Sequence, residues 1–445
     1  MKPRTHGLLH WVFPAILAVS AIGMLISGRD FSVVGELMAG APPPRPAAMQ
    51  WIQRLVSLLL VVATVERINN YFTQGQGIPS RALALTFVGF WIGSVAAPAL
   101  WSPHPRLSHE FVYSLALGIA AVLSSTADRD KVLDAARNSL FLFMLIGALL
   151  IPIKPPLVLE LDYSQGLLAG IPRFAGLSVH AVSLGMLSLT AILCLWQRPF
   201  ERRWLNRLAW LLGLAVLFFA QSKTAWISAM LSFTAMILVR HTANFWRRLG
   251  DPESNSFGIL ACLVFIMAVT SVMVVVVLGE AQAVVTAFFD SAQGAQAVSF
   301  TGRDRIWAIA LEEWRASWWF GYGPSLWDDD FRASIGMPFA THAHNQYMDT
   351  LARSGTVGAA TLVVYAFVLF VLSVRYAVAT GGLSLGLFLA LAMRSVSEVP
   401  LALFNYDTEV FTHLLLVVTL ASTAASRKPA PETEAGFADP RMRLA

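Results

Sequence analysis

The stretches Thr301-Gly302-Arg303-Asp304-Arg305-Ile306-Trp307 and His342-Ala343-His344-Asn345-Gln346-Tyr347 belong to one polar segment, Glu280–Gly355, of an otherwise hydrophobic chain. The other segments between apolar runs are short, and a long polar loop in such a chain usually carries function. This segment combines paired histidines with clustered arginines, among them Arg303 and Arg305. These residue types supply a general base and an anion-binding site.

The composition is that of an integral membrane protein. The 445 residues are 56% hydrophobic and only 13% charged, with a mean hydropathy of +0.61. Soluble domains carry about 25% charged residues. Long, unbroken apolar runs favour helices over a barrel, whose strands would alternate. The two cysteines, Cys194 and Cys262, lie inside apolar runs and are expected to pack as small hydrophobes.

The apolar runs predict an all-α protein with about twelve transmembrane helices. They lie near 8–27, 51–66, 80–100, 109–127, 135–153, 177–196, 207–221, 224–239, 257–279, 356–374, 382–396 and 409–425. Nine spans then fall within residues 1–279 and three within 356–425, and the large loop 280–355 separates them. The charged, proline-containing tail 426–445 is predicted to be disordered.

Basic residues set the predicted orientation. Pairs of arginines in short loops, as in Glu201-Arg202-Arg203 and Trp246-Arg247-Arg248, mark the cytoplasmic side. Both termini are then cytoplasmic, and the loops 154–176, 280–355 and 396–408 face outward. Basic residues on the cytoplasmic side account for the net charge of +5, so no nucleic-acid partner is expected.

The outward loop 280–355 is predicted to be partly helical. Residues 306–316 place Ile306, Ile309, Ala310 and Trp314 on one face at helical spacing. Residues 321–324 are expected to form a turn. A short helix is expected over 345–354, with Gly355 at its junction with the next span.

Among the basic residues on the predicted outer face, four are candidates for function: Arg173, Lys223, Arg303 and Arg305. Basic side chains at membrane depth are expensive, and they usually serve function or reach for lipid headgroups. Both interpretations remain open for Lys223. Arg305 could instead pair with Asp304 or a nearby glutamate.

His342 and His344 are two residues apart, so in an extended segment they would point to one side. A neutral imidazole is the natural general base near neutral pH. The pattern also fits two surface histidines. A metal site with Asp349 or with the acidic run 328–330 is a further interpretation, but the spacing is too loose for zinc and no metal is predicted.

Several elements, in this order, resemble the signature of the O-antigen ligase and O-antigen polymerase superfamily. They are Arg173-Phe174-Ala175-Gly176, Ser222-Lys223-Thr224-Ala225-Trp226, Gly302-Arg303 with Trp307, Gly321-x-Gly323, His344-Asn345-x-x-Met348 and Gly355-x-x-Gly358. Many members carry an asparagine near the position of His180, so His180 is assigned no role. The aromatic pair Trp318-Trp319 fits either an interfacial belt or a sugar-stacking surface.

The resemblance implies glycosyl transfer at the periplasmic face of the bacterial inner membrane. The implied donor is a glycan on undecaprenyl diphosphate, and in a ligase the acceptor is the lipid A–core oligosaccharide. Lys223, Arg303, Arg173 and Arg305 would neutralise the leaving diphosphate. His344 would act as the general base, supported by His342 and Asn345. The expected reaction is an inverting transfer without metal or cofactor, at the surface of the lipid bilayer.

Three other functions remain open. A polymerase would use the same donor with a lipid-linked acceptor, and a protein O-oligosaccharyltransferase would use a protein acceptor. A transporter for a lipid-linked sugar would need charged residues deep within several spans. The charged residues Arg54, Glu66 and Arg394 all fall near predicted span ends, which disfavours transport.

Overall fold

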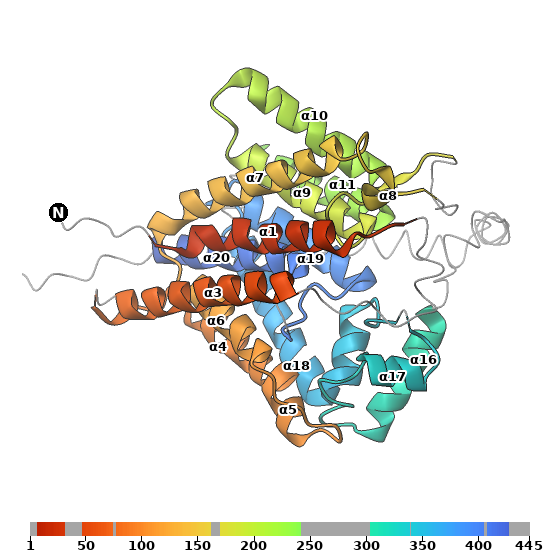
Figure 1. Cartoon of the computed structure of the whole chain (residues 1–445). Helices are drawn as coiled ribbons and strands as arrows, with labels where there is room; N and C mark the ends of the chain where they lie inside the picture. The colour runs from red at the N-terminus through yellow and green to blue at the C-terminus, as the bar shows by residue number, and fades with distance from the viewer. Residues whose placement is uncertain are drawn as a thin grey trace, which may run out of the picture.

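The computed structural model describes residues 7–31, 47–73, 77–161, 170–241, 303–338, 340–404 and 407–426. These residues form a bundle of helices with a smaller helical unit at one end (Figure 1). The predicted span 257–279, the first part of the predicted loop and the predicted tail lie outside the described residues.

The elements follow one another in chain order. They are α1 (Leu9–Ser27), α3 (Ala47–Thr73), α4 (Arg81–Trp91), the π-helix η1 (Ile92–Ala96), α5 (Ala97–Trp101), α6 (Glu110–Val122), α7 (Thr126–Leu149), α8 (Pro155–Val158), β1 (Leu159–Glu160), β2 (Arg173–Phe174), α9 (Ala181–Gln197), α10 (Arg203–Phe219), α11 (Lys223–His241), α16 (Arg303–Ala316), α17 (Asp329–Ser334), α18 (Gln346–Arg375), α19 (Leu383–Ser397), the 3-10 helix η3 (Thr408–Val410) and α20 (Phe411–Ser426).

Helices long and apolar enough to cross a membrane are a prominent part of the described structure. There are five of them: Leu9–Ser27, Arg81–Trp101, Thr126–Leu149, Gln346–Arg375 and Thr408–Ser426. Shorter apolar helices occupy Glu110–Val122, Ala181–Gln197 and Leu383–Ser397. The predicted helical fold is confirmed, and these five helices could each span a membrane by their length and composition. The predicted number of twelve spans stays a prediction.

Two helices form the centre of the bundle. Nearly every residue of α9 and of α20 is buried, which fits their apolar sequences without a polar face. The hydroxyl groups of Thr190 and Thr412 join the two helices at 2.8 Å. Around them, α1 packs on α3 and α7, α10 packs on α9, and α19 packs on α11 and α18.

The helix α18 changes direction at Gly355. This residue has φ +64° and ψ −164° within an otherwise helical run, so the helical hydrogen bonds are interrupted there. The freed backbone groups bond to the turn that follows α16: Tyr322 N–H donates to Ala352 O at 2.8 Å, and Thr356 N–H donates to Trp318 O at 2.8 Å. The predicted junction at Gly355 is confirmed, and this kink attaches the turn to the bundle.

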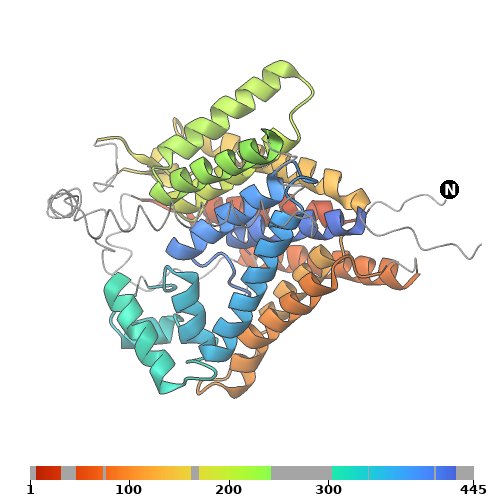
Figure 2. The ribbon, with the colours of Figure 1, turned by 180° about the vertical axis from the view of Figure 1, so that it is seen from behind.

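The helices α16 and α17 belong to a small unit with its own apolar core. Ile306 and Ala310 of α16 are buried against Leu326, Phe331 and Ala343. The predicted amphipathic helix over 306–316 is confirmed by α16. In Figures 1 and 2 this unit lies at the end of the bundle away from the start of α1, beside the first turns of α18.

A short antiparallel ladder is the only pairing of β-strands in the described residues. The strands β1 and β2 pair Leu159 with Phe174 and Glu160 with Arg173. The prediction of an all-α fold missed this ladder because each strand has only two residues. Its importance is local, since it fixes the position of Arg173.

Candidate functional site

The segment 342–344 is held in place from two sides just before α18 begins. Ala343 N–H donates to the Asp349 carboxylate at 3.0 Å, and the Trp307 indole donates to Ala343 O at 2.8 Å. Asp349 comes from α18 and Trp307 from α16. Because both backbone groups of Ala343 are fixed, the two flanking histidine side chains are fixed in direction.

The imidazole rings of His342 and His344 lie together, with their centroids 4.2 Å apart. The backbone between them is not extended as predicted, because His344 has φ +49°. This left-handed conformation is uncommon outside glycine, and it turns both rings to the same side. Such strain is often found at functional sites.

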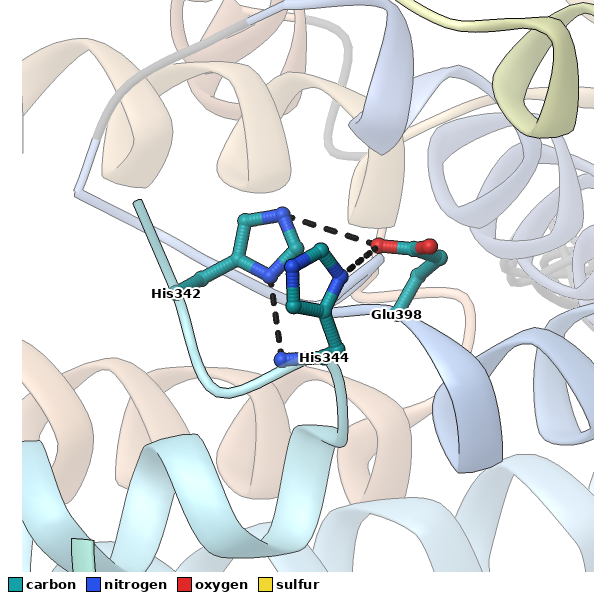
Figure 3. Close-up of side chains that lie close together, drawn as sticks. All are labelled: His342, His344 and Glu398. Carbon is teal, nitrogen blue, oxygen red and sulfur yellow. Dashed lines mark hydrogen bonds and ion pairs between the residues drawn. The ribbon is translucent and has the colours of Figure 1, made fainter. Parts of the chain in front are cut away.

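Both rings face one carboxylate, that of Glu398 at the end of α19 (Figure 3). His344 Nδ1 lies 3.2 Å from Glu398 Oε2, and His342 Nε2 lies 3.5 Å from the same oxygen. The amide of His344 donates to His342 Nδ1 at 3.1 Å. All three side chains are half-buried.

These contacts define which nitrogens carry hydrogen. An ionised carboxylate only accepts, so the nitrogens that face Glu398 are the donors. His342 Nδ1 accepts an amide hydrogen, which again leaves the hydrogen of His342 on Nε2. His344 then carries its hydrogen on Nδ1, and its Nε2 lone pair is free to take a proton.

The charges of the cluster keep Glu398 ionised. Burial works to raise the pKa of Glu398, but the hydrogen bond from His344 and the charges of His342, His344 and Arg394 lower this pKa to about 2. Burial and the neighbouring imidazole of His344 lower the pKa of His342 below its ordinary value. The site therefore combines a carboxylate anion with a neutral imidazole at His342 near neutral pH.

Arginine side chains approach this carboxylate from two helices. Arg303, the first residue of α16, has Nη2 4.0 Å from Glu398 Oε1. Arg394, one turn before Glu398 in α19, is 1% exposed and forms an ion pair with Glu409. Arg303 thus lies beside the histidines, as the sequence predicts.

Arg173 and Lys223 lie close to each other in the fold, although 50 residues separate them in the chain. Arg173 Nη1 pairs with Glu160 at 3.2 Å, and Arg173 Nε donates to Ala220 O at 3.2 Å. Ala220 belongs to the turn before α11, and the exposed Lys223 is the first residue of that helix. The charges of Glu160 and Glu398 both act on His180, so the carboxylate that pairs with Arg173 and the carboxylate of the histidine cluster both lie near that residue.

Arg305 has a different environment from Arg303. Residues two apart on a helix point in different directions, and Arg305 donates to Ile335 O at 3.2 Å. The structure does not bring Arg305 to Glu398. Its predicted diphosphate contact stays a prediction.

Asn345 has a clear structural role. Its side-chain oxygen accepts the amides of Tyr347 at 3.0 Å and Met348 at 3.1 Å, so it caps α18. Its amide nitrogen donates to Val396 O at 3.2 Å, two residues before Glu398. Asn345 therefore ties the histidine segment to the end of α19, and its supporting role in the reaction stays a prediction.

Glu398 was missed by the sequence interpretation. The loop 396–408 was predicted to face outward, and an acidic residue at the end of an apolar span was an available signal. No short motif connects Glu398 with residues 342–344, because the contact spans more than 50 positions. Asp349, considered as a metal ligand, instead accepts hydrogen bonds from Ala343 and Arg353.

His342, His344 and Glu398 also form a group with metal-binding potential. Their ligand atoms lie within 4.8 Å of one another. Three protein ligands of this kind resemble a catalytic zinc site in composition. Ligation through His342 Nε2 would, however, require the hydrogen on that ring to move to Nδ1, where the amide of His344 already donates.

The fold and this cluster describe a multi-pass helical membrane protein with a histidine–carboxylate site beside arginine. Residues 208–363 match the model of the family described as O-antigen ligase. The match includes most of α10, all of α11, α16 and α17, and the first part of α18, and thus Lys223, Arg303 and both histidines. It supports the assignment of the chain to the O-antigen ligase and polymerase superfamily made from the sequence. No curated protein matches the chain.

Proposed function

We propose that this protein is an O-antigen ligase that transfers a glycan from undecaprenyl diphosphate to the lipid A–core oligosaccharide at the periplasmic face of the inner membrane. The observation that carries the proposal is the contact of Glu398 with both imidazoles, because in the neutral ring of His344 this contact takes the Nδ1 hydrogen and leaves the Nε2 lone pair for a proton. The family match supplies the reaction class.

The transfer is a displacement at the anomeric carbon of the donor. His344 Nε2 takes the proton of the acceptor hydroxyl as its oxygen forms the new glycosidic bond. The bond to the diphosphate breaks and the diphosphate leaves with the electron pair. Glu398 stabilises the imidazolium that forms, as a carboxylate does for the base of a catalytic triad.

Basic side chains balance the charge that grows on the leaving diphosphate. Arg303 lies beside the histidines, while Arg173 and Lys223 lie at the start of α11. Fixed cations in a partly desolvated site stabilise such a leaving group without an ion. Arg305 is retained as an outer member of this group.

Reconstitution distinguishes the proposed reaction from its relatives. Purified protein in liposomes is given an undecaprenyl-diphosphate-linked glycan and either lipid A–core, a second lipid-linked glycan or an acceptor protein. Mass spectrometry of the product identifies the acceptor. Product formed only with the second lipid-linked glycan would show that the protein is a polymerase and not a ligase. Movement of intact donor across the bilayer without product would indicate transport.

The base assignment is tested by His344→Ala. We expect a loss of transfer of about 10²–10⁴-fold, because the acceptor hydroxyl loses its proton acceptor. His342→Ala should cost less, since this ring only supports Glu398. His10→Ala, at the other end of the bundle, is the matched control with wild-type turnover. Near-normal turnover of purified, folded His344→Ala would show that the assignment is wrong.

A further inference from the structure

A second feature of the site is a cavity of about 690 Å³ that reaches His342. The segment before α6, the turn between α16 and α17, and the segment after α19 contribute its wall. A group bound in this cavity would lie next to the proposed base cluster. Its lining therefore bears on which substrate reaches that cluster.

The cavity wall carries an excess of negative charge. Each guanidinium on the wall is already paired with a carboxylate, in the pairs Arg106–Asp328, Arg332–Asp329 and Arg353–Asp349. Glu110, Asp330 and Asp407 also line the cavity, and no ion pair is formed by them within the described part of the chain. The potential inside the cavity is therefore negative.

This charge decides which substrate the cavity fits. A diphosphate would meet uncompensated carboxylates there, whereas the basic side chains proposed to bind it line other surfaces. A sugar without anionic groups meets carboxylates as hydrogen-bond acceptors for its hydroxyls. An amine on the sugar would add a charge-assisted bond.

A buried donor on the same wall points to a ligand independently. Trp327 lines the cavity and is only 4% exposed, and its indole N–H has no hydrogen-bond acceptor within the described residues. Trp327 also has φ +68°, which is a strained conformation for a bulky residue. A buried donor without a partner is costly, and a sugar oxygen in the cavity would satisfy it.

We propose that this cavity is the acceptor subsite and that it takes an uncharged or amine-bearing sugar and rejects a carboxylated or phosphorylated one. The inference rests on the proposed function, because it assigns the cavity to the acceptor of that transfer. The three carboxylates set the charge preference, and Trp327 donates to the sugar.

The charge preference is tested by binding, without transfer. The full chain in nanodiscs carries His344→Ala, and three disaccharides differ only in the non-reducing residue: glucose, glucosamine or glucuronic acid. Saturation-transfer NMR gives each Kd. We expect the glucuronic acid probe to bind about tenfold more weakly than the glucose probe, and the glucosamine probe to bind at least as tightly as glucose.

Substitutions assign this preference to the cavity. Glu110→Gln combined with Asp330→Asn should reduce the difference between glucose and glucuronic acid to about threefold or less. Glu201→Gln removes a carboxylate from a separate cavity and should leave all three Kd values unchanged. Equal binding of the three probes, or an unchanged preference in the double variant, would overturn the proposal.

Trp327→Phe separates a ligand contact from a structural role. A purely structural indole without a partner predicts unchanged or higher thermal stability and unchanged sugar binding. We expect unchanged stability and a Kd for the glucose probe about fivefold weaker. Unchanged binding in Trp327→Phe would overturn the indole contact.

The two proposals fail separately. If the probes bind with the expected order but purified wild-type protein transfers no glycan, the proposed function is wrong and the sugar subsite stands. If wild-type protein transfers glycan but the double variant keeps wild-type acceptor KM and acceptor preference, the cavity is not the acceptor subsite and the transfer reaction stands.

Discussion

A carboxylate that contacts two imidazoles determines which nitrogen can act as a base. Glu398 holds the Nδ1 hydrogen of His344, which directs the other nitrogen of that ring away from the carboxylate. His342 contacts the same carboxylate, and its Nδ1 accepts a hydrogen bond from the amide of His344. We therefore expect His342 to orient Glu398 and the His344 backbone, and not to take the substrate proton. The different roles of the two histidines follow from these contacts.

Glu398→Gln should lower kcat by about 10²-fold with little change in donor KM, because the imidazolium loses its counter-charge. The pKa of Glu398 is lowered from 4.5 to about 2. The interactions of this carboxylate are therefore complete above pH 4.5 and are lost only as the pH falls toward 2. An acid limb between about pH 5 and 8 must come from another group.

The pH–rate profile measures this directly. Wild type and Glu398→Gln should both keep an acid limb in that range, although the variant has the lower plateau. Disappearance of the limb in Glu398→Gln would show that the carboxylate itself titrates there. Lys223→Gln should lower the plateau without changing the shape of the profile.

Arg303→Lys tests the kind of contact made with the diphosphate. A guanidinium binds two phosphate oxygens at once, whereas an ammonium is a single point charge. We expect Arg303→Lys to raise the donor KM and lower the rate nearly as much as Arg303→Ala. Arg315→Lys, in the last turn of the same helix, is the control and should leave the donor KM and the rate unchanged, because this exposed side chain has no proposed contact with a substrate. Full activity of Arg303→Lys would indicate charge steering.

At the scale of elements, the kink in α18 aligns the candidate site. Gly355 ends the helical segment that begins after Asn345, and the turn 318–323 bonds to the backbone exposed there. A Cβ at Gly355 would lie 2.3 Å from Trp319 O. The unit that carries Arg303 and Trp307 therefore docks on α18 only if this position lacks a side chain.

Gly355→Ala should consequently lower the thermal unfolding temperature and remove most transfer activity. The cost combines a backbone conformation that is nearly restricted to glycine, φ +64° with ψ −164°, with the clash against Trp319 O. Gly336 has the same φ of +64°, but a Cβ added there would meet nothing within 4 Å. Gly336→Ala thus measures how far a side chain at a positive φ lowers the unfolding temperature when no clash is added. An equal loss of stability in both variants would show that the contact with Trp319 O contributes nothing.

The sequence predicts individual helices better than it predicts their partners. The span predicted at 382–396 is α19 (Leu383–Ser397), because an apolar run bounded by glycine and polar residues has few other solutions. The span at 51–66 becomes the longer α3 (Ala47–Thr73). There Arg67 continues the helix and pairs with the buried Asp128 at 2.6 Å, a partner 61 residues away.

At the scale of the whole molecule, the candidate site joins distant segments. Local patterns indicated His344 and Arg303, since each lies in a short motif. The position of Glu398 depends on how α19 packs against α18, and the position of Arg173 depends on a ladder of two-residue strands. Contacts of this kind arise from the complete bundle, so Glu398 could not be connected to the histidines from the sequence, and Arg173 was grouped with them only through the family resemblance.

The histidine–carboxylate cluster also determines whether the reaction needs a metal ion. His342, His344 and Glu398 have the ligand atoms for one, but His342 could ligate only by giving up the bond from the His344 amide. Arg303 also lies 4.0 Å from Glu398, so a fixed cation already approaches this carboxylate and would repel an ion. We therefore expect purified protein to keep its transfer activity in excess EDTA, and added magnesium or manganese to change the rate little. A metal-dependent glycosyltransferase assayed in the same buffer must lose activity. Loss of transfer in EDTA with recovery on adding a divalent ion would contradict this expectation and would make these three residues candidate ligands of an ion that helps the basic side chains to neutralise the leaving diphosphate.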